Sequence, residues 1–225
     1  MLKDRPLSIL EAVVRDFINT GVPVSSKRLF QDHGFEIKPA TIRAELNQLT
    51  ESGFLSQPHT SGGRIPTDKA YRLFAEHFVA TPNPNFNFPA LENWLRSKMN
   101  KFIDEVSEEL RILSVGYNPR QQEVYKSGLD DLVGSLDFEN KKDIFEVVSD
   151  FEMIDERVNS ILNYLDNRPK VFIGKSPITK SQNLSVVAGR YKRGEDPLIL
   201  IAIGPKRMDY EKVIQLFKAL NNDDE

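Results

Sequence analysis

Arg43 and Asn47 are the residues whose types and spacing point most clearly to chemistry, because they stand one helical turn apart after Pro39. An arginine can donate two hydrogen bonds to O6 and N7 of guanine, and an asparagine can pair with N6 and N7 of adenine. Side chains on one exposed helix face read base edges in this way in the major groove of DNA. The pattern favours DNA contact, and a local ion pair of Arg43 with Glu36 or Glu51 is the alternative.

A second group of polar residues lies in the turn-rich segment that follows. Gly62 and the glycine after it permit close approach of a backbone, and Arg64 adds a fixed charge beside the Thr60 hydroxyl. Such groups suit contact with phosphates or the minor groove. His59 is explained equally well as a DNA contact or as a turn residue that bonds to the backbone.

Lys27 and Arg28 form a third basic position. They follow Ser25 and Ser26, which are good helix caps, so they stand at the start of a short helix. A phosphate bound there would use the two cations and the exposed backbone N–H groups of the helix.

The first third of the sequence predicts the elements that would position these residues. Apolar spacing and turn formers predict helices over 7–18, from 25 or 26 to 32, and from Pro39, a hairpin with strands at 54–55 and 64–65, and a helix over 67–78. Three helices, a hairpin and a closing helix are the pattern of a winged helix-turn-helix DNA-binding domain, expected at residues 1–79.

The middle of the chain predicts a linker and a long helix. Residues 80–89 contain three prolines and three asparagines, which is typical of a linker. Residues 90–117 are expected to form one amphipathic helix that dimerises, with packing on the chain's own C-terminal domain as the alternative. The stripe expected to mediate dimerisation consists of Leu91, Leu95, Met99, Phe102, Val106 and Leu110, and it extends to Leu113.

The remainder, residues 118–225, is expected to be a smaller α/β domain. Helical spacing occurs over 129–138 and 142–165, β-rich runs over 171–173, 184–191 and 198–203, and a last helix over 209–220. The fold class predicted for the whole chain is α+β.

Several functions are excluded or disfavoured by composition. The chain has 225 residues, no cysteine, three histidines and a formal charge of −3, so a basic surface would have to be local. Gly174-Lys175-Ser176 resembles the end of a phosphate-binding loop, but Pro169 replaces the required glycine. We therefore expect no enzymatic activity, no metal and no cofactor. No apolar run is long enough to span a membrane, so a cytoplasmic location is expected.

Five segments carry a resemblance to a known family. They are PATIRAELNQLTESGFL (39–55), QPHTSGGRIPTDKAYR (57–72), VYKSGLDDLVGSLDF (124–138), VFIGKSP (171–177) and IAIGPKRMDY (201–210). They resemble the bacterial HrcA family of heat-inducible transcription repressors. The resemblance implies a winged helix followed by a GAF-like domain, and a homodimer that binds an inverted-repeat operator in double-stranded DNA upstream of chaperone genes. It also implies release on heating and a GroEL-type chaperonin as a partner.

The resemblance also assigns DNA contacts by position: Thr41, Arg43, Asn47, His59, Thr60 and Arg64. Two departures bear on what is expected here. The family usually has Asn where this chain has Ala44, so the operator sequence is expected to differ. Between Tyr117 and Val124 the family has its first GAF-like strands and an inserted dimerisation region, which six residues replace here. A reduced sheet of about three strands, less stable to heat than the wing, is therefore expected.

Two other functions are compatible with the sequence. One is a ligand-sensing transcription regulator whose GAF-like domain binds a small molecule that controls release of DNA. The other is an interaction protein with a vestigial wing.

Overall fold

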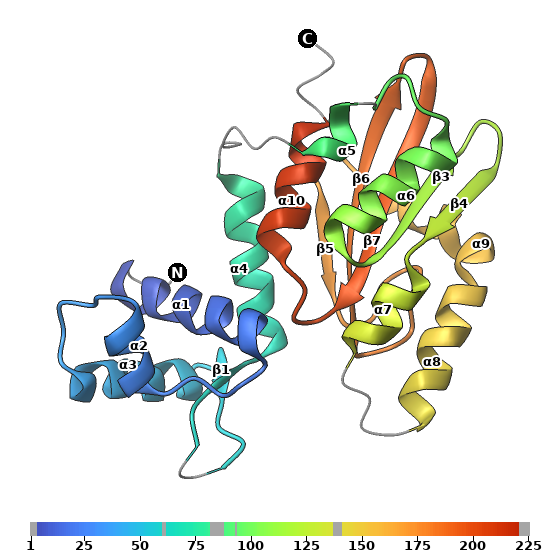
Figure 1. Cartoon of the computed structure of the whole chain (residues 1–225). Helices are drawn as coiled ribbons and strands as arrows, with labels where there is room; N and C mark the ends of the chain where they lie inside the picture. The colour runs from blue at the N-terminus through green and yellow to red at the C-terminus, as the bar shows by residue number, and fades with distance from the viewer. Residues whose placement is uncertain (1–3, 60–61, 82–87, 93, 137–140, 221–225) are drawn as a thin grey trace. The chain divides into compact units, whose positions relative to one another are not determined.

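The structure, a computed structural model, describes residues 4–59, 62–81, 88–92, 94–136 and 141–220 (Figure 1). The chain divides into two compact units, Met1–Phe74 and Ala75–Glu225. It combines helices and strands, so the expected α+β class is confirmed. No helix among the described residues combines the length and apolar content that a membrane span requires.

The first unit contains the helices that the periodicity predicted. They are α1 (Asp4–Thr20), α2 (Ser26–Asp32), α3 (Pro39–Glu51) and the start of α4 (Asp68–Ala80). Ser25 caps α2, because its side chain accepts a hydrogen bond from the main-chain N–H of Arg28 at 3.2 Å. The apolar faces of these helices form one buried core, which includes Leu10, Val14, Leu29, Ile42, Leu46, Leu49, Tyr71 and Phe74.

A short hairpin lies between α3 and α4. Its strands β1 (Leu55–Ser56) and β2 (Ile65–Pro66) pair antiparallel, close to the predicted positions. An isolated bridge adds Val24 opposite Arg64, with N–H···O distances of 2.9 and 2.8 Å in the two directions. The hairpin is therefore attached to the chain that leads into α2.

The second unit is built on a five-stranded antiparallel sheet with the order β4-β3-β7-β6-β5. The strands are β3 (Leu113–Asn118), β4 (Glu123–Ser127), β5 (Lys170–Ile173), β6 (Leu184–Arg193) and β7 (Asp196–Pro205). The last three are the strands that the β-rich runs predicted.

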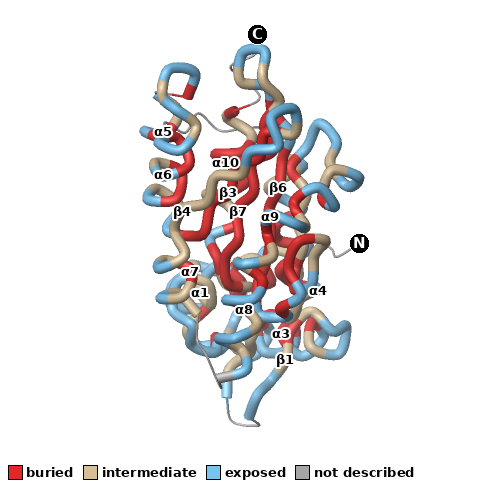
Figure 2. The backbone as a smooth tube through the Cα atoms, turned by 90° about the vertical axis from the view of Figure 1, so that its right-hand side faces the viewer, coloured by how far each residue is buried: buried red, intermediate tan, exposed pale blue. Residues whose placement is uncertain are grey.

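Helices cover both faces of this sheet. The helices are α5 (Pro89–Glu92), α6 (Met99–Leu110), α7 (Leu129–Ser135), α8 (Lys141–Glu152), α9 (Ile154–Arg157), the 3-10 helix η1 (Val158–Tyr164) and α10 (Tyr210–Ala219). Ile103 of α6 lies against Gly116, and Phe217 of α10 packs on Tyr191, whereas Val147 and Ile161 pack with Val115 on the opposite face. Because both faces are covered, β3, β6 and β7 are buried along most of their length (Figure 2), and β7 is almost continuously apolar from Leu198 to Ile203.

The predicted helix over 90–117 is wrong. The structure has α5 and α6 instead, separated by turns, and β3 begins at Leu113. Arg193 explains the break, because its guanidinium donates hydrogen bonds to the main-chain oxygens of Trp94 and Ser97. Those oxygens would otherwise continue a helix. At the other end, Arg111 adopts a left-handed conformation with φ 52° and terminates α6.

The prediction that this helix exposes a dimerisation stripe is also wrong for its centre. Phe102 and Val106 are fully buried against the chain's own sheet, Leu91, Met99 and Leu110 are half-buried, and Leu95 is 61% exposed. The alternative, packing on the chain's own C-terminal part, is the one observed. Most of the predicted linker, residues 82–87, lies outside the described residues.

The expected reduction of the sheet to about three strands is wrong as well. β3 and β4 form a hairpin in the region where the first strands were expected to be missing. Leu113 satisfied the helical spacing of the preceding stripe, and β4 is half-exposed and polar, so neither strand had a distinct signal.

Candidate nucleic-acid interface

The exposed face of α3 carries the predicted base-reading residues. Pro39 occupies the first turn, where its missing N–H costs nothing, and Ile42, Leu46 and Leu49 turn inward with at most 3% exposure. Arg43 and Asn47 are both exposed, as is Thr41 in the first turn. The spacing of the apolar residues therefore placed the polar face correctly.

The side chain of Arg43 has no hydrogen bond or ion pair with another residue in the part of the chain that the structure describes. The alternative, a local ion pair with Glu36 or Glu51, is not observed there. Among the described residues, nothing therefore competes with a ligand for the Arg43 guanidinium.

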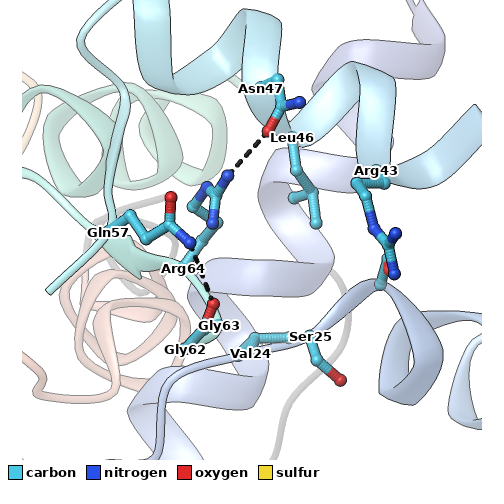
Figure 3. Close-up of a pocket in the computed structure, with 10 residues that line it drawn as sticks. Val24, Ser25, Arg43, Leu46, Asn47, Gln57, Gly62, Gly63 and Arg64 are labelled. Carbon is cyan, nitrogen blue, oxygen red and sulfur yellow. Dashed lines mark hydrogen bonds between the residues drawn. The ribbon is translucent and has the colours of Figure 1, made fainter. Parts of the chain in front are cut away.

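Arg64 and Asn47 are joined, which the sequence did not indicate. The Nη2 atom of Arg64 donates to Oδ1 of Asn47 at 2.7 Å (Figure 3). The Nε atom of Arg64 donates to Oγ1 of Thr50 at 3.0 Å. Thr50 lies three residues after Asn47 and so on the same side of α3, and its hydroxyl donates to the carbonyl oxygen of Leu46 at 2.8 Å. The hairpin arginine is thus anchored on α3.

Gly63 makes the close approach of the hairpin possible. A Cβ atom there would lie 2.6 Å from main-chain atoms of Pro23 and Val24. Only glycine leaves room for the Val24–Arg64 bridge, so Gly63 fixes the position from which Arg64 reaches α3.

A cavity of about 430 Å³ collects these groups between α3, the start of α2 and the hairpin (Figure 3). It brings together three predicted residues, Arg43, Asn47 and Arg64. The other lining residues are Val24, Ser25, Ser26, Leu46, Gln57, Gly62 and Gly63. Of these, Ser25, Ser26 and Gln57 are polar residues that the sequence did not single out as contacts.

The remaining predicted contacts lie outside this cavity. Lys27 is exposed, and Arg28 is half-buried and forms ion pairs with Asp16 at 3.5 Å and Asp32 at 3.4 Å. His59 is exposed near the end of the hairpin, and Thr60 lies outside the described residues. Arg28 is therefore a weaker phosphate ligand than its position suggested, because two carboxylates already neutralise its charge.

The geometry supports neither a metal site nor a small-molecule site among the described residues. In the described residues, no three or more His, Asp or Glu side chains cluster in a way that suits a metal. A cavity of about 630 Å³ in the second unit is lined by four glutamates with Arg111, Lys212, Pro89 and Ala90. Sites for small molecules are usually apolar with a few polar groups, and this cavity has the opposite character.

Comparisons with known proteins identify the family of the second unit. Residues 67–214 match the family model described as HrcA protein C terminal domain, which is more than half of the chain. The second unit is therefore a C-terminal domain of the HrcA type. The chain belongs to the HrcA family.

Individual relatives match smaller parts of the chain. The heat-inducible transcription repressor HrcA of Frankia casuarinae is 40% identical over 115 residues, which are 51% of this chain and 34% of that protein. The protein of the same name from Cutibacterium acnes is 49% identical over 84 residues, 37% of this chain and 24% of that protein. The matches thus span about a third or less of these relatives.

A solved structure shares the fold. A crystal structure of a hypothetical protein superimposes with a TM-score of 0.78, covering 99% of this chain and 97% of that chain at 19% identity. This similarity shows that the two proteins share a fold.

Proposed function

We propose that this chain is a sequence-specific DNA-binding transcription repressor of heat-shock genes, without catalytic activity, that acts in the cytoplasm. The observation that supports it most is the cavity in which Arg43, Asn47 and Arg64 meet. Two of these residues come from the exposed face of α3 and the third from the hairpin. A helix that presents base-reading side chains beside a basic hairpin is the arrangement of a winged helix-turn-helix.

The proposed organisation has a DNA-binding domain at residues 1–79 and a GAF-like regulatory domain after the linker. The relatives are named heat-inducible transcription repressors, which supports repression and release by heat. The GroEL-type chaperonin remains an expectation from the resemblance.

The repressor is proposed to act as a homodimer on an inverted repeat. One winged helix reads only a few base pairs, so useful specificity requires two copies on half-sites about one or more helical turns apart. Because Phe102 and Val106 are buried in the chain's own core, the proposed pairing surface does not include the centre of the predicted stripe.

Capture of genomic fragments by the purified chain tests the proposal. Bound fragments are sequenced, and affinity for a recovered duplex is measured at several salt concentrations. We expect a shared inverted repeat, an affinity that falls as salt rises, and two chains per duplex by light scattering. Absence of salt-dependent binding to any duplex would refute the proposed function.

A further inference from the structure

The pair formed by Arg64 and Asn47 determines which atoms α3 offers to a base. Arg64 is held by its main chain, which exchanges two hydrogen bonds with Val24, and by its side chain, which donates to Thr50 and Asn47. A guanidinium carries only donors, so the amide atom that faces it is the oxygen of Asn47. Among the described residues, no side chain or main-chain oxygen accepts from the amide NH2 group of Asn47, which leaves this group for an outside partner.

This orientation is unsuited to adenine. Reading adenine with two hydrogen bonds requires the asparagine oxygen to accept from N6 while the NH2 group donates to N7. Here the guanidinium at 2.7 Å already uses one of the two lone pairs of that oxygen. A donor that used the second lone pair would lie beside the positive charge of Arg64, so acceptance from the adenine N6–H2 group is disfavoured.

The same orientation suits a base edge made of acceptors. The NH2 group of Asn47 and the remaining N–H groups of Arg64 are all donors, and both residues line one cavity. Guanine presents two acceptors, O6 and N7, in the major groove, and no other base edge there presents two acceptors alone.

We propose that Asn47 and Arg64 act as one unit that selects guanine at one position of the DNA site, with Arg64 setting the orientation of Asn47. The inference rests on the proposed function and makes it more specific, because asparagine alone would select adenine. Arg64 is thus a specificity-determining residue, although it lies in the hairpin and not in the helix that enters the groove.

Selection from a random duplex library tests the inference with the full chain and with Asn47→Ala. The position at which Asn47→Ala loses base preference is the one read by Asn47, and we expect guanine there in the unaltered chain. Replacing that guanine by 7-deazaguanine, which lacks the N7 acceptor, should weaken binding of the unaltered chain roughly 5- to 100-fold and leave Asn47→Ala unaffected.

Two further variants separate orientation from simple contact. Arg64→Met frees the Asn47 oxygen, so preference at that position should change from guanine to adenine. In Asn47→Asp, the new carboxylate still binds Arg64, now as an ion pair, so the fold is retained. The variant lacks the amide N–H donors of Asn47, so the preference for guanine should be lost. Arg72→Met, an exposed arginine of α4, is the control for loss of one charge and should keep guanine.

The outcomes distinguish this inference from the proposed function. If no duplex is bound in a salt-dependent manner, the proposed function fails and the inference fails with it. If duplex binding is intact but the Asn47 position selects a base other than guanine, or if Arg64→Met leaves the preference unchanged, the inference alone is overturned.

Discussion

Arg193 donates from Nε to the carbonyl oxygen of Trp94 at 2.5 Å, a contact between residues 99 positions apart that ends the helical run before α6. Its guanidinium also lies over the Trp94 ring, 5.6 Å from the ring centre. Trp94 is buried and is the only tryptophan of the chain, so it reports on this contact directly.

Removal of this contact should destabilise the second unit. We expect Arg193→Met to lower its free energy of unfolding by about 1–3 kcal/mol, because buried main-chain oxygens lose charged donors. Urea denaturation followed by Trp94 fluorescence measures the change. Lys192→Met, an exposed neighbour in the same strand, is the control and should change it by less than about 0.5 kcal/mol. Equal effects of the two variants would show that the contact contributes nothing.

Tyr191 is expected to limit stability at high pH. Its hydroxyl is buried without a hydrogen-bond partner among the described residues, in space left by Gly189. Burial raises the pKa of Tyr191 well above its ordinary value of 10.0. Near pH 8 the folded and unfolded states both keep the proton. As pH rises above 10.0, only the unfolded state loses it, so the free energy of unfolding falls.

Tyr191→Phe should therefore reduce the alkaline loss of stability. At pH 8 we expect the variant to be equal to the unaltered chain or up to about 2 kcal/mol more stable, since it removes an unsatisfied buried hydroxyl. Urea midpoints at pH 8 and pH 10.5 provide the measurement. Tyr164→Phe is the control, because Tyr164 is 55% exposed. An unchanged alkaline loss in Tyr191→Phe would contradict the assignment.

Gly63→Ala should disrupt the hairpin and with it DNA binding. The added Cβ would lie 2.6 Å from main-chain atoms of Pro23 and Val24, so the bridge to Arg64 must separate. We expect the first unit to lose about 1–3 kcal/mol of stability. Thermal denaturation by far-UV circular dichroism and duplex affinity measure the two effects. Gly134→Ala, where a Cβ meets nothing within 4 Å, should affect neither. A Gly63→Ala variant that binds DNA normally would show that the bridge is dispensable.

The sequence predicted most of the first unit because its signals are local. Pro39, the Ser25 cap and the spacing of Ile42, Leu46 and Leu49 each specify structure within a few residues. The same signals placed Arg43 and Asn47 on the exposed face.

What the sequence did not reveal depends on distant partners. The Arg64–Asn47 bond spans 17 positions and exists only when the hairpin has its observed register. The end of the helical run depends on Arg193, about 100 positions away, and no glycine marks the left-handed residue Arg111. The spacing of apolar residues does not show contacts with distant parts of the chain. The helix was therefore predicted to continue through residues that form β3.

Arg43 and Lys27 should differ in how they contribute to DNA binding. We expect Arg43→Ala to lose about 1–3 kcal/mol on the selected site and little on random duplex, because base contacts differ between sites. Lys27→Ala should weaken both duplexes evenly and reduce the salt slope by about one unit. Anisotropy titrations at several salt concentrations measure both. Equal losses by both variants on both duplexes would contradict this division of roles.

Heating is expected to act first on the first unit, Met1–Phe74. The predicted weakness of the C-terminal part rested on a sheet of about three strands, whereas the sheet has five and is covered on both faces. The first unit spans Met1–Phe74, with a hairpin of two-residue strands. Small units bury a smaller share of their surface than units about twice their length, so the first unit should unfold at the lower temperature.

Simultaneous measurement of duplex release and Trp94 fluorescence tests this order, because Trp94 reports only on the second unit. We expect a labelled duplex to be released before the fluorescence changes. Val14→Ala removes a core side chain of α1 that does not line the cavity, so it should lower the release temperature and leave the Trp94 transition in place, while Arg193→Met should do the reverse. Release that follows the Trp94 transition, and that moves with Arg193→Met, would show that heat acts through the second unit instead.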